Sequence, residues 1–304
     1  MQNAIGIFTT RTNNKIHTMT KKYDIIWSEE LDSTNEEARR RISDLDNLSV
    51  LSVERQTAGR GQRGNSWRSA PGENLTFSII VKFRKGDASS EESSGDSATL
   101  PQLKATDQFV LSEISSLALV RLLENHGIRA SVKWPNDIYI GSCKVCGMLI
   151  ENSILGSSVS SSIIGIGLNV NQRNFDVSLP NPTSMLLEAM KKEFDLKALL
   201  EEFMDIFVTV IDRFMDDRQN SFEELRDEYL SHLWRLNETA RFIDYTVLPS
   251  GHSDKPVVTG ITDTAGKEFT GIIRGLSPVG NLLVEDLDAV ALREFSFKEI
   301  GCIL

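Results

Sequence analysis

The stretch QTAGRGQRGNSW, residues 56–67, decides how this chain is interpreted. Its glycines permit positive φ angles and a close approach of the backbone to a ligand. Successive backbone N–H groups in such a loop can bind an anion, and Arg60 and Arg63 offer planar donors to a phosphate or a carboxylate. Residues 49–54 and 75–83 are typical of strands. We therefore expect a loop that is held between two strands and covers a bound acyl phosphate.

Two common phosphate-binding motifs are excluded for this loop. No Gly-Lys-Ser/Thr follows the glycines, so the loop is not a P-loop, and the strand pattern after it does not fit the dinucleotide fingerprint, which opens a helix. Glycine and arginine alone would also suit a solvated turn. A second stretch of the sequence favours the ligand-binding interpretation.

That second stretch is KWPND, residues 133–137, followed by KVCGMLIE, residues 144–151. Proline at 135 biases the residue before it to an extended conformation, and Asn136 and Asp137 suit a turn. Lys133, Asn136 and Asp137 should therefore cluster at a strand end, where a triphosphate and its metal ion can bind. Lys144 lies on the returning strand and close to the same turn.

A third stretch, IIGIGLNVN at residues 163–171, is typical of a buried strand. Its glycines permit a ligand or a neighbouring backbone to approach closely. Asn169 and Asn171 form its polar end. Taken alone, this stretch is weak evidence for a site.

In this order and spacing, the three stretches resemble the catalytic domain of biotin protein ligases. The LDSTN run at 31–35 and Trp67 also match, and the resemblance extends over about residues 23–301. It implies an α+β fold, in which a mixed sheet flanked by helices, of the class II synthetase-like type, precedes a small C-terminal SH3-like β-barrel. We expect the catalytic domain at 23–236 and the small domain at 237–304.

The resemblance also implies a two-step reaction. Biotin reacts with ATP and Mg²⁺ to give biotinyl-5′-AMP and pyrophosphate. Biotin is then transferred to a lysine of a biotin carboxyl carrier domain, in acetyl-CoA carboxylase or a related carboxylase. The resemblance leaves open whether edge strands of the catalytic domain pair with a second copy, as a homodimer, or with the acceptor.

The resemblance assigns roles to individual residues by position. The catalytic residues are Lys144, Arg60 and Lys133. The biotin-binding residues are Ser33, Thr34, Asn35, Gln56, Gly59, Arg60, Gln62, Trp67, Lys144 and Gly147. The ATP-binding residues are Arg60, Arg63, Lys133, Asn136, Asp137 and Asn169, and Asp137 is the expected Mg²⁺ ligand.

One residue of the loop departs from the family pattern. Gln62 stands where the family usually has arginine, and so a full positive charge near the adenylate is lost. Our hypothesis is that Arg63 or a neighbouring lysine compensates. Otherwise the adenylate is held less tightly and escapes more readily.

The net charge and the cysteine content exclude some other classes of function. The formal net charge of −10 argues against general nucleic-acid binding. The catalytic pattern begins near residue 23, and so we expect a ligase-only form without a DNA-binding module. No apolar run reaches the length of a membrane span. Cys143 and Cys146 have the spacing of a redox or metal pair, but three cysteines in such a chain better fit a reducing compartment, the cytoplasm.

Outside the motifs, the pattern predicts the following organisation. Residues 1–22 form a disordered leader, with Met19 as an alternative start. Residues 86–105, rich in Ser and acid, form a flexible insertion. Helices span 106–125, begin at 181, and cover 196–236 with a division at Asn220 and Ser221. Ser33 and Thr34 also suit the N-cap of a helix with an acidic first turn.

Three rival functions are consistent with parts of this pattern. The first is a lipoate or octanoate ligase, which shares the fold. The second is a non-catalytic biotin-binding or acceptor-docking protein, which would be expected to have lost Arg60, Lys133 or Lys144. The third is a bifunctional repressor, which requires an N-terminal module. The glycine-arginine loop with Trp67, together with residues 133–137, favours biotin ligation.

Overall fold

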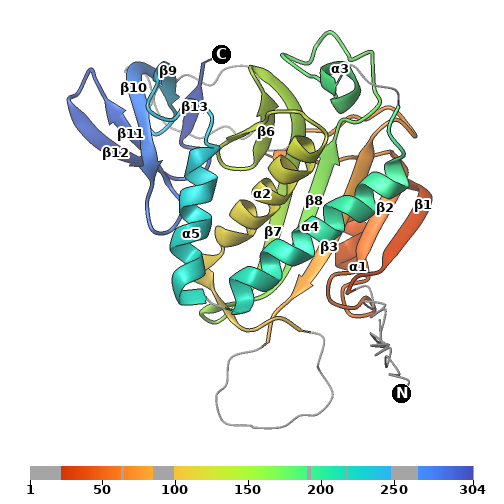
Figure 1. The fold of residues 1–304 in the computed structure, drawn as a ribbon. Helices are drawn as coiled ribbons and strands as arrows, with labels where there is room; N and C mark the ends of the chain where they lie inside the picture. Colours follow the sequence, from red (N-terminus) through yellow and green to blue (C-terminus); the bar gives the residue numbers. More distant parts are fainter. Residues whose placement is uncertain are drawn as a thin grey trace, which may run out of the picture.

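An eight-stranded mixed sheet forms the larger part of the fold (Figure 1). The computed structural model describes residues 22–62, 65–84, 99–189, 193–216, 218–247 and 266–303. The strands run in the order β1 (Ile25–Leu31), β2 (Val50–Gln56), β3 (Leu75–Lys82), β8 (Ser158–Leu168), β7 (Cys143–Leu155), β6 (Asp137–Ile140) and β5 (Ser131–Lys133), with β4 (Leu103–Lys104) on β8. β1 and β2 are parallel, and the other pairs are antiparallel.

The alternation of residues along β8 separates the two faces of this sheet. Ile164, Ile166 and Leu168 belong to the main core, which helices α2 (Val110–Asn125) and α4 (Leu196–Asp216) cover on one face (Figure 1). Because side chains alternate between faces along a strand, Gly165 and Gly167 point to the opposite face. That face therefore has room for a ligand.

A short helix and a small apolar cluster cover part of this second face. Helix α1 (Thr34–Arg40) packs its Ala38 against residues of β2, β3 and β8. The cluster consists of Ala38, Leu45, Leu51, Ile80 and Ile163. The sheet face beyond it, toward β7 and β6, remains for the site.

A second, five-stranded antiparallel sheet is built by the C-terminal part of the chain. Its order is β12 (Ala291–Phe295), β11 (Leu282–Asp286), β10 (Lys267–Leu276), β9 (Thr239–Asp244) and β13 (Ile300–Cys302). Phe242, Phe269 and Phe295 stack in its core. This small antiparallel sheet is consistent with the expected SH3-like domain, and helix α5 (Arg218–Ser231) lies between it and α2 (Figure 1). The boundary at 236 and 237 stays a prediction.

Several expected boundaries are wrong. The helix expected at 106–125 begins at Val110, after a short 3-10 turn, η2 (Ala105–Asp107). The helix expected at 181 is α3 (Met185–Ala189). Asn220 and Ser221, where the long helical region was expected to divide, both lie within helix α5.

The long helical region also ends early, at Ser231. Residues 232–236 were expected to be helical. Instead, the backbone of Val132 bonds to His232 and Trp234, so this segment covers the open edge of β5. The backbone of this segment pairs with an edge strand, and the spacing of apolar residues along the chain does not reveal such pairing.

The last part of the segment 86–105, which was expected to be a flexible insertion, forms a short strand instead. Leu103 and Lys104 pair with Val159 and Ser158, and Leu103 is buried. Residues 86–98 and the expected leader, apart from Lys22, lie outside the described residues. Among the residues that are described, no helix is both long and apolar enough to cross a membrane.

Candidate active site

A cavity of about 820 Å³ lies on the second face of the large sheet and reaches the C-terminal sheet. Three glycines on adjacent strands, Gly147, Gly165 and Gly167, line it. A methyl group on Gly167 would collide with the ring of Trp67, and one on Gly165 would collide with Asn35. The absence of side chains at these positions lets Trp67 and Asn35 rest directly on the sheet.

One end of the cavity is lined by a neutral polar cluster at the start of α1. The backbone N–H of Thr34 donates to Oε1 of Gln56 at 2.8 Å. Ser78 Oγ lies 2.7 Å from Thr34 Oγ1 and 2.6 Å from Asn35 Oδ1. Because the Gln56 oxygen is engaged by Thr34, its amide nitrogen is the group left to donate to a ligand.

Ser33 does not cap helix α1 through its side chain, contrary to the expectation. It occupies the N-cap position with an extended backbone, and its side chain makes no capping hydrogen bond. The nearly buried residue instead lines the cavity. The helix is held by its backbone, where Glu37 N–H donates to Ser33 O at 2.9 Å.

The glycine-arginine loop folds back on itself beside this cluster. Gly61 N–H donates to Asn65 O at 2.7 Å, and Trp67 N–H donates to Gly59 O at 2.9 Å. A Cβ at Gly59 would lie 2.7 Å from Gln56 Nε2. Gly59 thus shapes the loop without lining the cavity. Arg63 lies outside the described residues, so its expected part in ATP binding stays a prediction.

Two glutamates to which the sequence assigned no role hold Arg60. Its guanidinium pairs with Glu36 of α1 and lies 3.7 Å from Glu151 of β7. Arg39 pairs with the same two carboxylates, at 2.8 and 2.7 Å. Asn35 Nδ2 donates to Glu151 at 2.8 Å. Glu151 therefore joins the arginine of the loop to the polar cluster.

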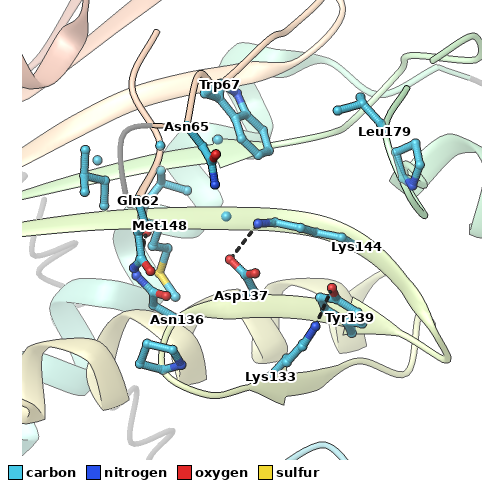
Figure 2. Close-up of a pocket in the computed structure, with 18 of the residues that line it drawn as sticks. Gln62, Asn65, Trp67, Lys133, Asn136, Asp137, Tyr139, Lys144, Met148 and Leu179 are labelled. Atoms are coloured by element: carbon cyan, nitrogen blue, oxygen red, sulfur yellow. Dashed lines mark hydrogen bonds and ion pairs between the residues drawn. The ribbon is translucent and has the colours of Figure 1, made fainter. Parts of the chain in front are cut away.

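The other end of the cavity is cationic. Lys144 Nζ lies 2.7 Å from Asp137 Oδ1 and 5.8 Å from the centre of the Trp67 ring. Figure 2 shows Trp67 and Asn65 on the loop side of the pocket, opposite Lys144, Asp137 and Lys133 on the strands.

Lys133 lies on the strand side of the pocket. Its Nζ donates to Tyr139 Oη at 3.0 Å and lies 5.3 Å from the centre of the Trp234 ring. Cation–π attraction of this kind holds an ammonium group without neutralising it. The charge of Lys133 thus stays available to an anion.

The balance of charges identifies the kind of ligand that suits this end. Among the described lining residues there are four cationic side chains, Arg60, Arg68, Lys133 and Lys144, and one carboxylate, Asp137. The whole chain has a formal charge of −10. Arg60 and Arg68 have carboxylate partners, but these partners do not line the cavity. The cavity wall is therefore cationic in an acidic protein, which favours a polyanionic ligand such as a nucleoside triphosphate.

Asn136 and Asn169 are nearly buried and fix the walls of the cavity. Asn136 Nδ2 donates to Met148 O at 2.6 Å, and Gln62 Nε2 lies 3.3 Å from the same oxygen. Asn169 Nδ2 donates to Thr183 O at 2.9 Å. Both amide groups are thus engaged with backbone, and direct contact of either with ATP stays a prediction.

Several lining residues carry no motif and were missed. Arg68, directly after Trp67, pairs with Asp176 at 3.1 Å and thereby joins the loop to the segment that precedes α3. The further lining residues without an expected role include Phe175, Leu179, Trp234, Phe242, Ile273, Leu282, Phe297 and Ile300. Four of them, Phe242, Ile273, Leu282 and Ile300, lie in the C-terminal sheet, and no local sequence signal marks them.

The chemistry of the cysteines argues against a redox or metal pair. Cys146 is fully buried, and burial raises the pKa of its thiol well above the usual range. All three cysteines are free. No group of three His, Cys, Asp or Glu side chains within the described part of the chain could hold a metal ion. Asp137 alone still fits Mg²⁺, which commonly takes one or two carboxylates and completes its coordination with substrate phosphates and water.

Comparisons with known proteins show which family and which fold this chain is similar to. The model of the biotin/lipoate A/B protein ligase family matches residues 27–169. The chain is 26% identical to the bifunctional ligase/repressor BirA of Salmonella typhimurium, over 90% of this chain and 72% of that protein. It is 28% identical to the biotin–[acetyl-CoA-carboxylase] ligase of Paracoccus denitrificans, over 68% of this chain and 80% of that protein.

A solved structure of similar fold carries ligands of the expected kinds. The biotin protein ligase from Aquifex aeolicus in complex with biotin and ATP matches with a TM-score of 0.65 at 25% identity, covering 92% of this chain and 98% of that chain. The fold, the site and the matches define a member of the biotin/lipoate protein ligase family. Within that family, the chain is an enzyme of the biotin protein ligase group.

Proposed function

We propose that the protein activates biotin with ATP and transfers it to a lysine of a biotin carboxyl carrier domain. One observation carries this proposal. A neutral polar cluster with a free amide donor, at Gln56, lies in the same cavity as the cationic group of Lys133 and Lys144. The first end suits a ureido ring, which has donors and an acceptor, and the second suits phosphates.

In the first step, a carboxylate oxygen of biotin forms a bond to the α-phosphorus of ATP. The bond from that phosphorus to the bridging oxygen breaks, and pyrophosphate leaves. Both reactants are anions, so fixed positive charge that offsets their repulsion lowers the barrier. In this proposal, Lys144 and Arg60 supply it near the biotin carboxylate and the α-phosphate. Lys133 holds the outer phosphates in the same proposal.

Magnesium would be held by Asp137 together with phosphate oxygens. When bound, it neutralises charge on the phosphates and on the leaving pyrophosphate. A carboxylate accepts at both oxygens. The pairing of Asp137 Oδ1 with Lys144 is therefore compatible with a metal ion at Oδ2.

In the second step, the amine nitrogen of the acceptor lysine forms a bond to the carboxyl carbon of the adenylate. The bond from that carbon to the AMP oxygen breaks, AMP leaves, and the amine loses a proton. Water would compete with the amine for the same carbon. Trp67 and the loop around it lie over the glycine floor and would keep water from the adenylate.

The nearest alternative is a lipoate or octanoate ligase of the same family. An aliphatic acyl chain cannot form hydrogen bonds with the Gln56 amide or with the polar cluster of Ser33, Thr34 and Asn35. Such buried polar groups cost free energy when a ligand leaves them unpaired. The cluster thus supports biotin over an aliphatic acid. The three free thiols support our further proposal of a reducing compartment such as the cytoplasm.

The test is ATP–pyrophosphate exchange with Mg²⁺, in which biotin, lipoate and octanoate are compared without any acceptor. We expect exchange with biotin alone. Exchange with lipoate or octanoate alone would move the protein to the sister activity, and no exchange with any acid would contradict adenylation. Transfer is then tested with a biotin carboxyl carrier domain and its Lys→Arg variant, and labelling of the variant would contradict the proposed acceptor site.

A further inference from the structure

A fully buried carboxylate lies at the joint between the large sheet's helices and the C-terminal sheet. Glu113 of α2 has no exposed surface, and its Oε1 pairs with Nε of Arg226 of α5. Its Oε2 is buried and has no hydrogen-bond partner among the described residues. Burial raises the pKa of Glu113, although Arg226 acts in the opposite direction. A carboxylate in such a place costs free energy that one ion pair does not clearly recover.

Arg226 joins this carboxylate to a turn of the C-terminal sheet. Its Nη1 donates to the backbone oxygen of Ser277 at 2.8 Å. Ser277 opens the turn 277–281 that connects β10 and β11, which closes with Ser277 N–H donating to Asn281 O at 2.8 Å. Helix α5 lies between α2 and this sheet (Figure 1).

The same turn holds the bend that carries the phosphate-site residues. Trp134 Nε1 donates to Gly280 O at 2.9 Å. Gly280 has a φ of 89°, and a Cβ there would collide with the Phe109 ring, so the turn fits closely against the start of α2. Pro135 O accepts from Ser112 Oγ at 2.8 Å. Trp134 and Pro135 line the cavity directly before Asn136 and Asp137.

We propose that Glu113 and Arg226 are positioning residues, which hold the 277–281 turn against Trp134 and thereby fix the phosphate-binding bend at 133–137. The ion pair joins Glu113 to Arg226, and Arg226 donates a hydrogen bond to the Ser277 carbonyl. At the other end of the turn, the Gly280 carbonyl accepts a hydrogen bond from the Trp134 indole. Neither charged residue touches the cavity. A buried ion pair of this kind imposes a geometry more than it stabilises the fold.

This inference rests on the proposed function, because it assigns the bend to ATP. The biotin end of the cavity, at Thr34 and Gln56, lies on other elements. Loosening the bend should therefore raise the KM for ATP and leave the KM for biotin unchanged. Charge-assisted hydrogen bonds to phosphate depend on geometry, so a loosened bend should bind ATP less tightly, and we expect the ATP KM to rise by about tenfold or more.

The experiment compares Arg226→Met with the double variant Glu113→Gln/Arg226→Met. Arg226→Met leaves a buried unpaired carboxylate and should destabilise the protein, whereas the double variant removes both charges and should recover stability. The matched control is Glu228→Gln, which breaks the Arg121–Glu228 pair between the same two helices at 2.7 Å without touching the turn. Its ATP KM should stay at the wild-type value.

Two readouts decide the outcome. The first is the KM for ATP and for biotin in pyrophosphate exchange, and the second is backbone amide hydrogen exchange at 133–140 and 277–281 without substrates. We expect the double variant to keep a raised ATP KM and faster amide exchange in both segments. Wild-type ATP KM or unchanged amide exchange at 133–140 in the stable double variant would overturn the inference.

The two proposals fail separately in this design. If the wild-type protein catalyses no pyrophosphate exchange, the proposed function fails. The amide exchange of the variants needs no substrate and still decides whether the ion pair positions the bend.

Discussion

Lys144 and Asp137 form an ion pair on neighbouring strands, with 2.7 Å between Nζ and Oδ1. Lys144 also lies near the Trp67 ring, and a Cβ on Gly147 would lie 3.0 Å from its Nζ. The ammonium group is thus confined between a strand, an indole and a carboxylate. This confinement positions it before any substrate binds, which is the condition under which a fixed charge is most effective in catalysis.

Replacing Lys144 by alanine should lower the rate of biotin-dependent pyrophosphate exchange by about 100-fold or more. Thermal stability should change little, because the pair is about one third exposed and partly screened by water. Lys144→Arg keeps the charge with a different geometry and should retain part of the rate. Near-native exchange in Lys144→Ala would show that the charge is not used.

Gly167→Ala should displace Trp67 and weaken biotin binding. The added methyl group would collide with the indole, and overpacking of this kind costs about 1–3 kcal/mol. The measurement is the Kd for biotin by calorimetry. In a Trp67→Ala background the same glycine change should cost little, because the collision is gone. An equal loss in both backgrounds would contradict the steric explanation.

Glu151→Gln should raise the KM for biotin with little loss of stability. The change removes a charged partner of Arg60 and weakens the hydrogen bond that fixes Asn35. Exposed pairs of this type contribute about 1 kcal/mol or less to folding, so the effect should appear in binding. Glu30→Gln, which breaks the exposed Arg55–Glu30 pair away from the cavity, is the control. Equal KM values in both variants would show that Glu151 does not position the loop.

Gln62→Arg should reduce the escape of free adenylate into solution. Gln62 lies near the Met148 carbonyl at the loop side of the cavity, where a guanidinium would add an attraction to the adenylate phosphate. The measurement is the amount of biotinyl-5′-AMP released during turnover without acceptor. No difference from the wild-type protein would sink the leak hypothesis and indicate that other cations already compensate for Gln62.

The parts of the fold that the sequence predicts are those with a local pattern. The stretch at 163–171 predicted a buried strand whose glycines admit a ligand, and in the structure Gly165 and Gly167 of β8 line the cavity. The turn chemistry at 133–137 brings Lys133, Asp137 and Lys144 to one end of a cavity. Each of these signals is local in the chain, at 163–171 and at 133–144.

The parts that could not be predicted depend on contacts between distant residues. Trp134 bonds to Gly280, which is far along the chain and carries no motif. The contact between Arg60 and Glu151 forms only when the tertiary fold brings the loop and β7 together. The helix was predicted to continue past Ser231 because the spacing of apolar residues carries no information about pairing with β5, which the next residues form.

Acid should destabilise the C-terminal sheet through Asp244 and Asp286. Burial alone would raise the pKa of Asp244, but hydrogen bonds from Thr246 and Arg293 outweigh it and lower that pKa. The pKa of Asp286 is also lowered, since backbone N–H groups and Arg293 outweigh its burial. In the unfolded protein, an aspartate has a pKa of about 3.9. Because the two pKa values are lower than this in the folded protein, both carboxylates stabilise the fold above that pH. This stabilisation is lost as the pH falls through the folded-state pKa values.

Asp244→Asn should therefore lower the free energy of unfolding at pH 7 by about 2 kcal/mol, the contribution of a hydrogen bond to a charged group. Its difference from the wild-type protein should shrink as the pH falls below about 4, because the wild-type carboxylate then becomes protonated as well. Urea unfolding of both proteins between pH 7 and pH 3 measures this. A difference that stays constant over that range would mean that Asp244 contributes through its shape and neutral hydrogen bonds, and not through its charge beside Arg293.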